Sequence, residues 1–402
     1  MITILYVPCY QYVSSIHPLV YSYLENCEIE NLQVINLNQV KNIDQLIEQS
    51  SLLIFDYSII EAMRISIKGQ KEFKSYIYFP NTEGTEFYKI CIEKILKNSK
   101  RKIFWASMND AQNLFENIDQ LELIGITRAE FLNKMEGIIW FTNSENLIKN
   151  NNNTKQYATG YEIICKKIND TADFVAKHFE YEFEIPHCVT IKKNYKQGIK
   201  KWDFYVPGVS YPTRKIALHS ATHLKLKNAN SKFITFLKNK YNGIIQRIYF
   251  INPEKVYTMN QNVMNFIIRH SKFTFVCGGP PNYFVRKFLE VPLQASVMVG
   301  YGPDNLADYG FIDAENYINA EPELFGDVVN TFVNNKTYQE KLTIAAYTAV
   351  SVLHSVEARS EQLVSSLIEI NKGVVKKGKF IGGQYSFLDQ NKNIIKIQEA
   401  VS

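Results

Sequence analysis

The sequence has 402 residues, more than one hydrophobic core usually organises, so we expect two domains. Its hydrophobic fraction of 46% and charged fraction of 21% are those of a folded globular protein, and they exclude a disordered or fibrous chain. The formal net charge is only +5, and the sequence has no basic stripe of the kind that binds nucleic acid, so we expect no nucleic-acid partner.

The cysteines are scattered and form no CxxC pair, which argues against a zinc site or a disulfide framework. The N-terminus enters an apolar run directly, without a charged leader. No apolar run approaches the roughly 20 residues that a membrane span needs. We therefore expect a soluble protein of a reducing compartment, in the cytoplasm.

Short apolar runs alternate with helical segments through the first part of the chain. The expected strands are Ile2–Val7, Leu32–Leu37, Leu52–Tyr57, Lys74–Phe79, Lys102–Ala106 and Gly137–Thr142. The expected helices between them are His17–Asn26, Thr85–Leu96, Asn109–Phe115 and Arg128–Met135. Strands buried on both faces and joined by helices are typical of a parallel sheet. The four asparagines Asn150–Asn153 favour neither helix nor sheet, so we expect a loop there.

The alternation starts again after a polar, lysine-rich segment, Lys192–Lys201, which we interpret as a linker. The expected strands around and after it are Phe179–Ile185, Phe204–Val206, Gly243–Ile251, Phe273–Cys277 and Ser296–Val299. The expected helices are one that begins at Thr213 and the segments Asn260–His270, Pro281–Leu289, Glu321–Asn334 and Gln339–Ile370.

These patterns predict an α/β protein with two Rossmann-like domains that face a cleft. We expect an N-terminal domain over residues 1–190, a C-terminal domain over residues 200–370, and a tail over residues 371–402. The tail is basic and rich in glycine, and it either packs on the first domain or stays loose.

Two strand–turn–helix junctions in the second domain are candidates for ligand binding. The first, Pro207–Lys215, contains Ser210 and places Arg214 and Lys215 at a helix N-terminus, where free N–H groups and the helix dipole favour a phosphate. A plain connection with surface cations is the alternative.

The second junction contains Gly278 and Gly279, which permit close approach of the backbone to a ligand. Its helix carries Lys287 and Glu290, and Glu290 lies in an otherwise apolar run. A carboxylate there needs a partner, either the two hydroxyls of a ribose or a salt bridge to Arg286 or Lys287.

Residues that follow strands of the first domain are candidate catalytic groups. His17, Asp56 and Glu145 each follow a strand expected to end at the cleft, and each has an alternative role as a cap or surface residue. His219 and His223 share a helix face, but no HExxH pattern accompanies them, so we predict no metal and no cofactor. The absence of a P-loop argues against an ATPase.

The segment Ser271–Val299 resembles the donor-binding segment of GT-B glycosyltransferases. Within it, Lys287–Ala295 (KFLEVPLQA) is similar to the family pattern (K/R)-x-x-E-x-P-x-x-G. Asp308–Ile318 (DYGFIDAENYI) resembles the family's GF-x-D-G-x-N-Y segment, and His354, Ser355 and Arg359 match its late helix. The chain departs from the family at Ala295 and Ala314, where glycine is usual, and this leaves the donor identity open.

The resemblance implies that the C-terminal domain holds a nucleotide-sugar donor and the N-terminal domain a glycan or glycolipid acceptor. Glu290 would then bind the ribose, Arg214 and Lys215 the phosphates, and Gly278 and Gly279 would let the sugar phosphate approach. The implied role is synthesis of a bacterial surface polysaccharide, lipopolysaccharide or capsule, with peripheral association with the inner membrane as a further expectation.

Three other functions stay open at this point. A transferase for a CMP-linked acidic sugar (Kdo-like) would use the cations at Arg214, Lys215, Arg286 and Lys287 to hold an extra carboxylate. A sugar-nucleotide epimerase has the same fold but needs no acceptor domain. A non-catalytic binding module would explain the two alanines that replace glycine.

Overall fold

The computed structural model describes most of the chain. The described residues are 1–11, 16–27, 29–69, 77–79, 81–107, 111–153, 161–191, 198–208, 211–230, 262–279 and 282–398. The expected strand Gly243–Ile251 lies outside these residues, as does Ser210.

A large sheet organises the first unit of the molecule. Its parallel strands are β1 (Ile2–Tyr6), β3 (Leu32–Asn36), β4 (Leu52–Asp56), β6 (Arg101–Trp105), β7 (Gly137–Trp140) and β8 (Tyr181–Glu184). They lie in the order β8-β7-β6-β4-β1-β3, so the chain reverses its direction of travel across the sheet at β1. Such a switch point opens a crevice at the carboxyl ends of the two central strands, here β1 and β4.

Helices cover both faces of this sheet. They are α1 (Ile16–Glu25), α2 (Ile43–Gln49), α3 (Ser58–Lys68), α4 (Thr85–Lys97), α5 (Leu114–Ile118), α6 (Arg128–Leu132), α7 (Ser144–Asn153) and α8 (Tyr161–His178). Alternate residues of each strand face opposite layers: Ile4 packs in the apolar cluster that contains α1, and Leu5 and Phe55 in the cluster that contains α3 and α4. This burial on both faces is what the continuous apolar runs predict.

Two local expectations for the first unit are wrong. Asn150–Asn153 is the last turn of α7 and not a loop. Asn150 and Asn151 are buried in this helix and their amide N–H groups have partners: Nδ2 of Asn150 donates to Oδ1 of Asn305 at 2.6 Å, and Nδ2 of Asn151 to the carbonyl of Cys165 at 2.7 Å. In the run Lys74–Phe79, the described part forms only the short β5 (Ile77–Tyr78), which pairs antiparallel with β2 (Tyr10–Gln11) outside the main sheet.

A second, smaller parallel sheet organises the next unit. Its strands are β9 (Trp202–Tyr205), β10 (Ser271–Cys277), β11 (Val297–Tyr301) and β12 (Ile318–Asn319), in the order β12-β11-β10-β9. The helices around it are α9 (Pro212–Thr222), a helix over 262–269, α12 (Lys287–Glu290), α13 (Phe325–Phe332) and α14 (Lys336–Leu353). The α12 helix is shorter than the expected Pro281–Leu289, because residues 282–286 are turn and irregular backbone.

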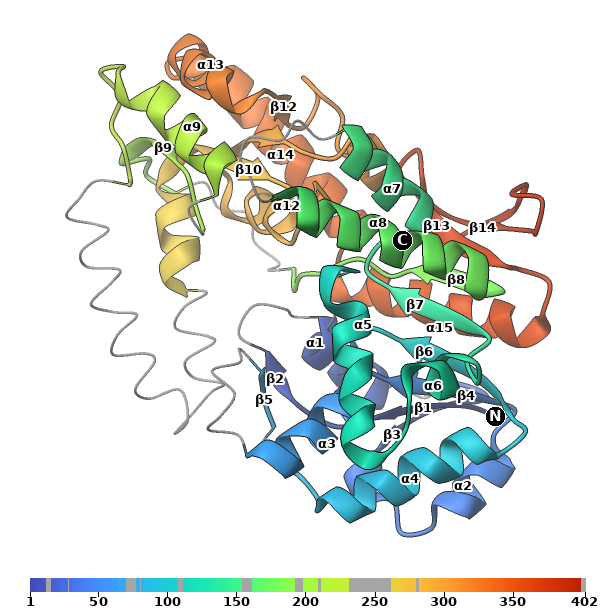
Figure 1. Cartoon of the computed structure of the whole chain (residues 1–402). Coiled ribbons are helices and arrows are strands. Elements are labelled where there is room, and N and C mark those ends of the chain that lie inside the picture. Colours follow the sequence, from blue (N-terminus) through green and yellow to red (C-terminus); the bar gives the residue numbers. More distant parts are fainter. Residues whose placement is uncertain are drawn as a thin grey trace.

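The chain returns to the first unit near its C-terminus, as Figure 1 shows. The expected long helix Gln339–Ile370 is broken at His354, and α15 (Val356–Lys372) starts from the N-cap Ser355. Helix α15 packs against α1 and β1. The strands β13 (Lys377–Ile381), β14 (Gln384–Leu388) and β15 (Ile394–Ile397) then extend the first sheet beyond β8, so the tail packs on the first unit.

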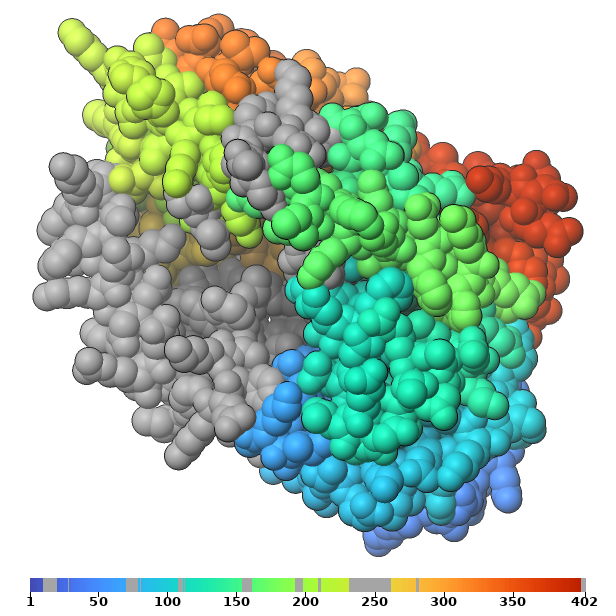
Figure 2. Space-filling view, viewed as in Figure 1, coloured from blue at the N-terminus to red at the C-terminus, as the bar shows by residue number. Residues whose placement is uncertain are grey.

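The predicted α/β class is confirmed by this architecture, in which the second sheet is parallel and the first is parallel except at its edge, where β14 pairs antiparallel with β13 and β15. Strands β8 and β9 belong to different sheets, so the chain passes from one unit to the other between Glu184 and Trp202. Figure 2 shows the two units as adjacent lobes, with the C-terminal strands beside the first. A buried apolar cluster runs from Ile4 of β1 through Val189 to Phe284 of the second unit, so the units share part of their core. No described helix is long and apolar enough to cross a membrane.

Candidate functional site

The predicted donor-site residues gather at the carboxyl ends of β9 and β10. The turn after β9 contains Gly208, whose backbone has φ +93°, a conformation that favours glycine. A Cβ on Gly208 would lie 2.4 Å from Nη1 of Arg214, so the Arg214 guanidinium folds back over this turn. The same guanidinium lies 4.9 Å from the centre of the Tyr211 ring, an attractive cation–π distance. Arg214 therefore points toward the strand ends from the first turn of α9.

The turn after β10 also needs glycine. A Cβ on Gly278 would lie 2.8 Å from the backbone of Asn282 and Tyr283, so this turn folds closely over Gly278. Gly279 follows with φ +72°. Asn282 is buried with φ 45°, and its Oδ1 has no hydrogen-bond partner among the residues that the structure describes. A buried acceptor without a partner is rare in folded proteins and marks a place where a ligand donor fits.

The short helix α12 carries an ion cluster. Nε of Arg286 lies 2.9 Å from Oε1 of Glu290, and Nζ of Lys287 donates to Oε2 of Glu290. The Glu290 side chain is only 5% exposed. Glu290 therefore forms the salt bridge that was the alternative prediction, and it does so with both Arg286 and Lys287. The ribose-binding role of Glu290 stays a prediction.

Arg214 belongs to the same electrostatic environment as this cluster. Burial lowers the pKa of Lys287, Glu290 opposes that change, and the positive charges of Arg286 and Arg214 add to it. Within this cluster Arg286 and Lys287 share the carboxylate of Glu290, and Arg214 is a further cation that acts on Lys287. Lys215 is exposed on α9. The site is thus suited to a strongly anionic group such as a diphosphate.

The first unit meets this edge through aromatic side chains. The Phe141 ring, just after β7, lies 5.0 Å from the ring of Tyr283 and 6.5 Å from that of His187, centre to centre. His187 lies on the connecting segment between the units, where Arg359 of α15 donates to its carbonyl oxygen at 3.1 Å. The carboxyl ends of both sheets therefore come together around these side chains.

The three candidate catalytic residues lie in different settings. Asp56 ends β4 at the switch point, where Oδ2 accepts from Tyr21 at 2.7 Å and from Ser107 at 2.6 Å, and Oδ1 accepts from the N–H of Ser58. His17 is the second residue of α1, and its side chain lies outside the described residues. The contacts described for Asp56 are with residues of the first unit.

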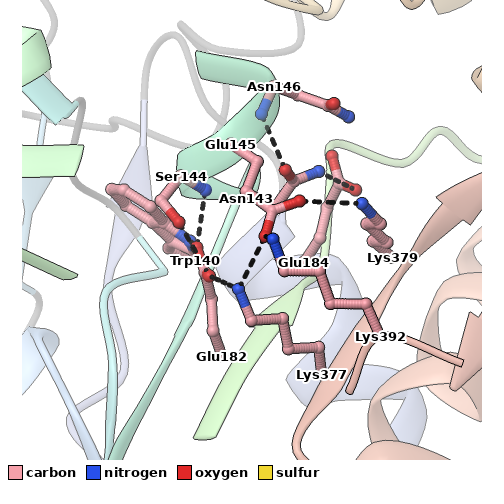
Figure 3. A network of polar contacts seen from close by, with 10 residues as sticks. All are labelled: Trp140, Asn143, Ser144, Glu145, Asn146, Glu182, Glu184, Lys377, Lys379 and Lys392. Atoms are coloured by element: carbon pink, nitrogen blue, oxygen red, sulfur yellow. Dashed lines mark hydrogen bonds and ion pairs between the residues drawn. The ribbon is translucent and has the colours of Figure 1, made fainter. Parts of the chain in front are cut away.

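Glu145 is part of a separate ion network, shown in Figure 3. Its carboxylate contacts the ammonium groups of Lys377 (3.1 Å), Lys379 (3.3 Å) and Lys392 (3.0 Å), all from the C-terminal strands and their turn. Burial opposes the effect, but these ion pairs lower the pKa of Glu145 to about 2. The contacts are those of a residue that fastens β13–β15 to the first unit.

Beside this network a second carboxylate bridges the two units. Glu184 accepts from Asn143 (3.2 Å), from the N–H of Phe380 (3.3 Å) and from the hydroxyl of Tyr309 in the second unit. Burial raises its pKa to about 7, although these hydrogen bonds oppose the rise. Sequence reasoning missed Glu184, His187 and Asn282, because no local pattern marks them.

The described residues offer no group of three or more histidine, cysteine, aspartate or glutamate side chains that could hold a metal ion. His219 lies on α9 and His223 is the C-cap residue of that helix, with their Nε2 atoms 3.0 Å apart. The prediction that no metal is needed is not tested by these observations. The two pockets described in the structure, of about 470 and 210 Å³, are lined by first-unit residues away from the α12 cluster, so the predicted cleft stays a prediction.

No protein-family model matches the sequence, and a search of curated proteins finds no match. Solved structures do resemble this fold. Anabaena Alr3699/HepE in complex with UDP-glucose matches with a TM-score of 0.44 and 8% identity, over 91% of this chain and 99% of that one. An alpha-glucosyltransferase in complex with UDP-glucose and abasic DNA matches with 0.45 and 11%, over 91% and 99%. A glycosyltransferase from Rickettsia africae matches with 0.36 and 12%, over 92% and 98%. Likenesses this distant assign neither an activity nor a ligand to this chain.

Proposed function

We propose that this protein is a glycosyltransferase that takes a sugar from a nucleotide-sugar donor bound at the second unit. The observation that supports the proposal most is the pair of cations, Arg286 and Lys287, around Glu290, with Arg214 near enough to act on Lys287. It lies at the carboxyl ends of parallel strands, the place where α/β sheets bind their ligands. The close turn at Gly278 lies between β10 and α12 and would let a ligand approach the backbone.

The chemistry that fits this cluster is substitution at an anomeric carbon. As the bond to the donor phosphate breaks, negative charge develops on the leaving diphosphate. Arg214 and Lys287 supply positive charge where it develops, and they are held in place before reaction by the Gly208 turn and by Glu290. Side-chain cations can stabilise this leaving group without a metal ion.

The acceptor side of the proposal rests on the first unit. We assign the acceptor, a glycan or glycolipid, to the carboxyl edge of the large sheet, where the chain reverses between β1 and β4. Among the candidate bases, Asp56 ends β4 at that edge. A role in bacterial surface polysaccharide synthesis, in the cytoplasm or at the inner face of the membrane, is part of the proposal.

A thermal-shift screen against UDP-, GDP-, CMP- and dTDP-sugars tests the proposal. UDP-glucose, which is bound in two of the similar structures, is a practical first probe. One nucleotide class should raise the melting temperature, because a ligand at 100 times its Kd stabilises the folded state by about 2.7 kcal/mol. The screen also separates the CMP-linked alternative from the others.

Release of nucleotide is then measured with the donor that binds, with and without an acceptor mixture. Turnover supports the transferase. Binding without any turnover would indicate a binding module, and a protein that no nucleotide sugar stabilises would contradict the proposal.

A further inference from the structure

His187 is held firmly beside the proposed donor site. It lies on the connecting segment, where Arg359 of α15 binds its carbonyl oxygen and the N–H of Val189 donates to the carbonyl of His354 at 3.0 Å. Its ring is stacked near Phe141, at an interplanar angle of 26°. The backbone contacts fix the position of the ring, so its side-chain chemistry can be changed without removing them.

One ring nitrogen of His187 is left without a partner. Nδ1 is buried and makes no hydrogen bond to any residue that the structure describes. Most buried polar side-chain atoms in folded proteins are hydrogen-bonded, so such an atom beside a candidate ligand site points to a ligand atom as its partner.

The charged groups around the ring come from two elements. The pKa of His187 is lowered to about 4 by burial, by Arg286 just before α12 and by Arg359 of α15. Glu290 of α12 opposes this decrease. Burial also raises the pKa of the neighbouring Cys188 thiol to about 11, so that thiol stays neutral. In the state described, the imidazole is therefore neutral near pH 7.

We propose that His187 belongs to the donor site and takes up one proton from solvent when the donor diphosphate binds, its Nδ1–H then donating to a phosphate oxygen. The inference rests on the proposed function. A diphosphate next to Arg286 offsets the positive field that keeps the ring neutral, and it supplies the acceptor that Nδ1 lacks. An imidazolium–phosphate hydrogen bond is charge-assisted and therefore strong.

Isothermal titration calorimetry measures this proton directly. The full-length protein is titrated at pH 6 to 8, in buffers of different ionisation enthalpy, with the nucleotide sugar that the thermal-shift screen selects. The phosphates of a nucleotide sugar do not titrate near neutral pH, so any proton that is taken up goes to the protein. We expect uptake approaching one proton at pH 6 and an affinity that falls by up to about tenfold per pH unit as pH rises.

The test variant is His187→Gln, which keeps polarity but cannot be protonated. We expect it to bind the donor about tenfold more weakly than wild type at pH 6, with no proton uptake and little dependence on pH. His178→Gln is the matched control, because His178 lies on α8 and stacks on Phe174, outside the proposed site. It should keep the wild-type proton uptake. A melting curve of each variant confirms that it is folded.

The outcomes separate the two claims. If no nucleotide sugar binds to wild type, the proposed function fails and the role of His187 fails with it. If wild type and His187→Gln bind the donor with equal affinity and equal proton uptake, the assignment of His187 is overturned while the proposed function stands.

Discussion

Arg214 is the residue whose position most directly links the sequence pattern to the proposed site. Its guanidinium lies over Gly208 and adds to the positive charge around Lys287. We expect Arg214→Ala to weaken donor binding by about 1–3 kcal/mol, the usual loss when a charge-assisted hydrogen bond is removed. Titration of the folded variant with the nucleotide sugar measures this loss.

Lys215→Ala provides the comparison for Arg214. Both residues were predicted to bind phosphate, but Lys215 is exposed on the next position of α9. We expect its removal to cost less than that of Arg214. Equal donor affinity in wild type and Arg214→Ala would show that Arg214 does not contact the phosphates.

Glu290 is the second residue whose role can be measured. Glu290→Gln keeps the volume but removes the charge that holds Arg286 and Lys287, so we expect a lower melting temperature. If the carboxylate also binds the ribose, donor binding weakens by about 1–3 kcal/mol. We expect both effects, measured by thermal denaturation and by titration of the donor.

Glu369→Gln is the matched control for Glu290. Glu369 is a buried carboxylate of α15 that pairs with Lys372 (3.1 Å) and Lys396 (3.0 Å), outside the proposed site. It should lower the melting temperature without changing donor affinity. The same behaviour in Glu290→Gln would make Glu290 a structural ion-pair partner only.

At the scale of elements, Glu145 joins α7 to the C-terminal strands. Because its pKa is lowered to about 2, its stabilising charge is fully present above its ordinary pKa of 4.5 and is lost as pH falls toward 2. We expect Glu145→Gln to lower the free energy of unfolding at pH 7 by about 1 kcal/mol, since the partly exposed lysines are screened by water. Turnover of the donor should stay at the wild-type level.

The comparison variant for Glu145 is Lys392→Gln, which removes one of its three cations and should have a smaller effect on unfolding. If Glu145→Gln instead abolished turnover in a folded protein, Glu145 would regain its predicted place as a catalytic candidate.

At the scale of the whole molecule, Glu184 makes the contact between the units sensitive to pH. Its pKa is raised from 4.5 to about 7, so its contribution to stability is fully present below pH 4.5 and is lost as pH rises through about 7. This shift corresponds to on the order of 3 kcal/mol. We expect Glu184→Gln to remove this loss, so that the variant falls less in stability than wild type between pH 5 and pH 8.

The buried His354 has the opposite effect on how the stability of the fold depends on pH. Burial, helped by Arg359, lowers the pKa of His354 to about 3, so its neutral state stabilises the fold above pH 6.5 and this is lost as pH falls. The test of Glu184 is therefore the difference between wild type and variant in chemical denaturation at each pH. A difference that does not change with pH would contradict the role of Glu184.

Elements whose signal is local were predictable from the sequence. Apolar runs such as Leu52–Asp56 predicted strands because both faces of these strands are buried. Arg286 and Lys287 could be predicted as ion partners of Glu290, because one helical turn brings residues three and four positions apart together. The need for glycine in the turn at Gly278 could be predicted for the same reason, since the turn is formed by neighbouring residues.

Contacts between groups far apart in the chain became known only from the folded arrangement of the two sheets. Glu145 was predicted as a catalytic candidate, but its partners Lys377, Lys379 and Lys392 lie more than 200 positions further along the chain. The amide of Asn150 reaches Asn305 in the other unit. The lowered pKa of His187 depends on its burial and on Arg286 and Arg359, which belong to separate elements. Local sequence patterns reflect backbone pairing and burial. The electrostatic potential and the hydrogen-bond partners of a buried polar group depend instead on how the two sheets pack together. No single segment of the sequence contains that information.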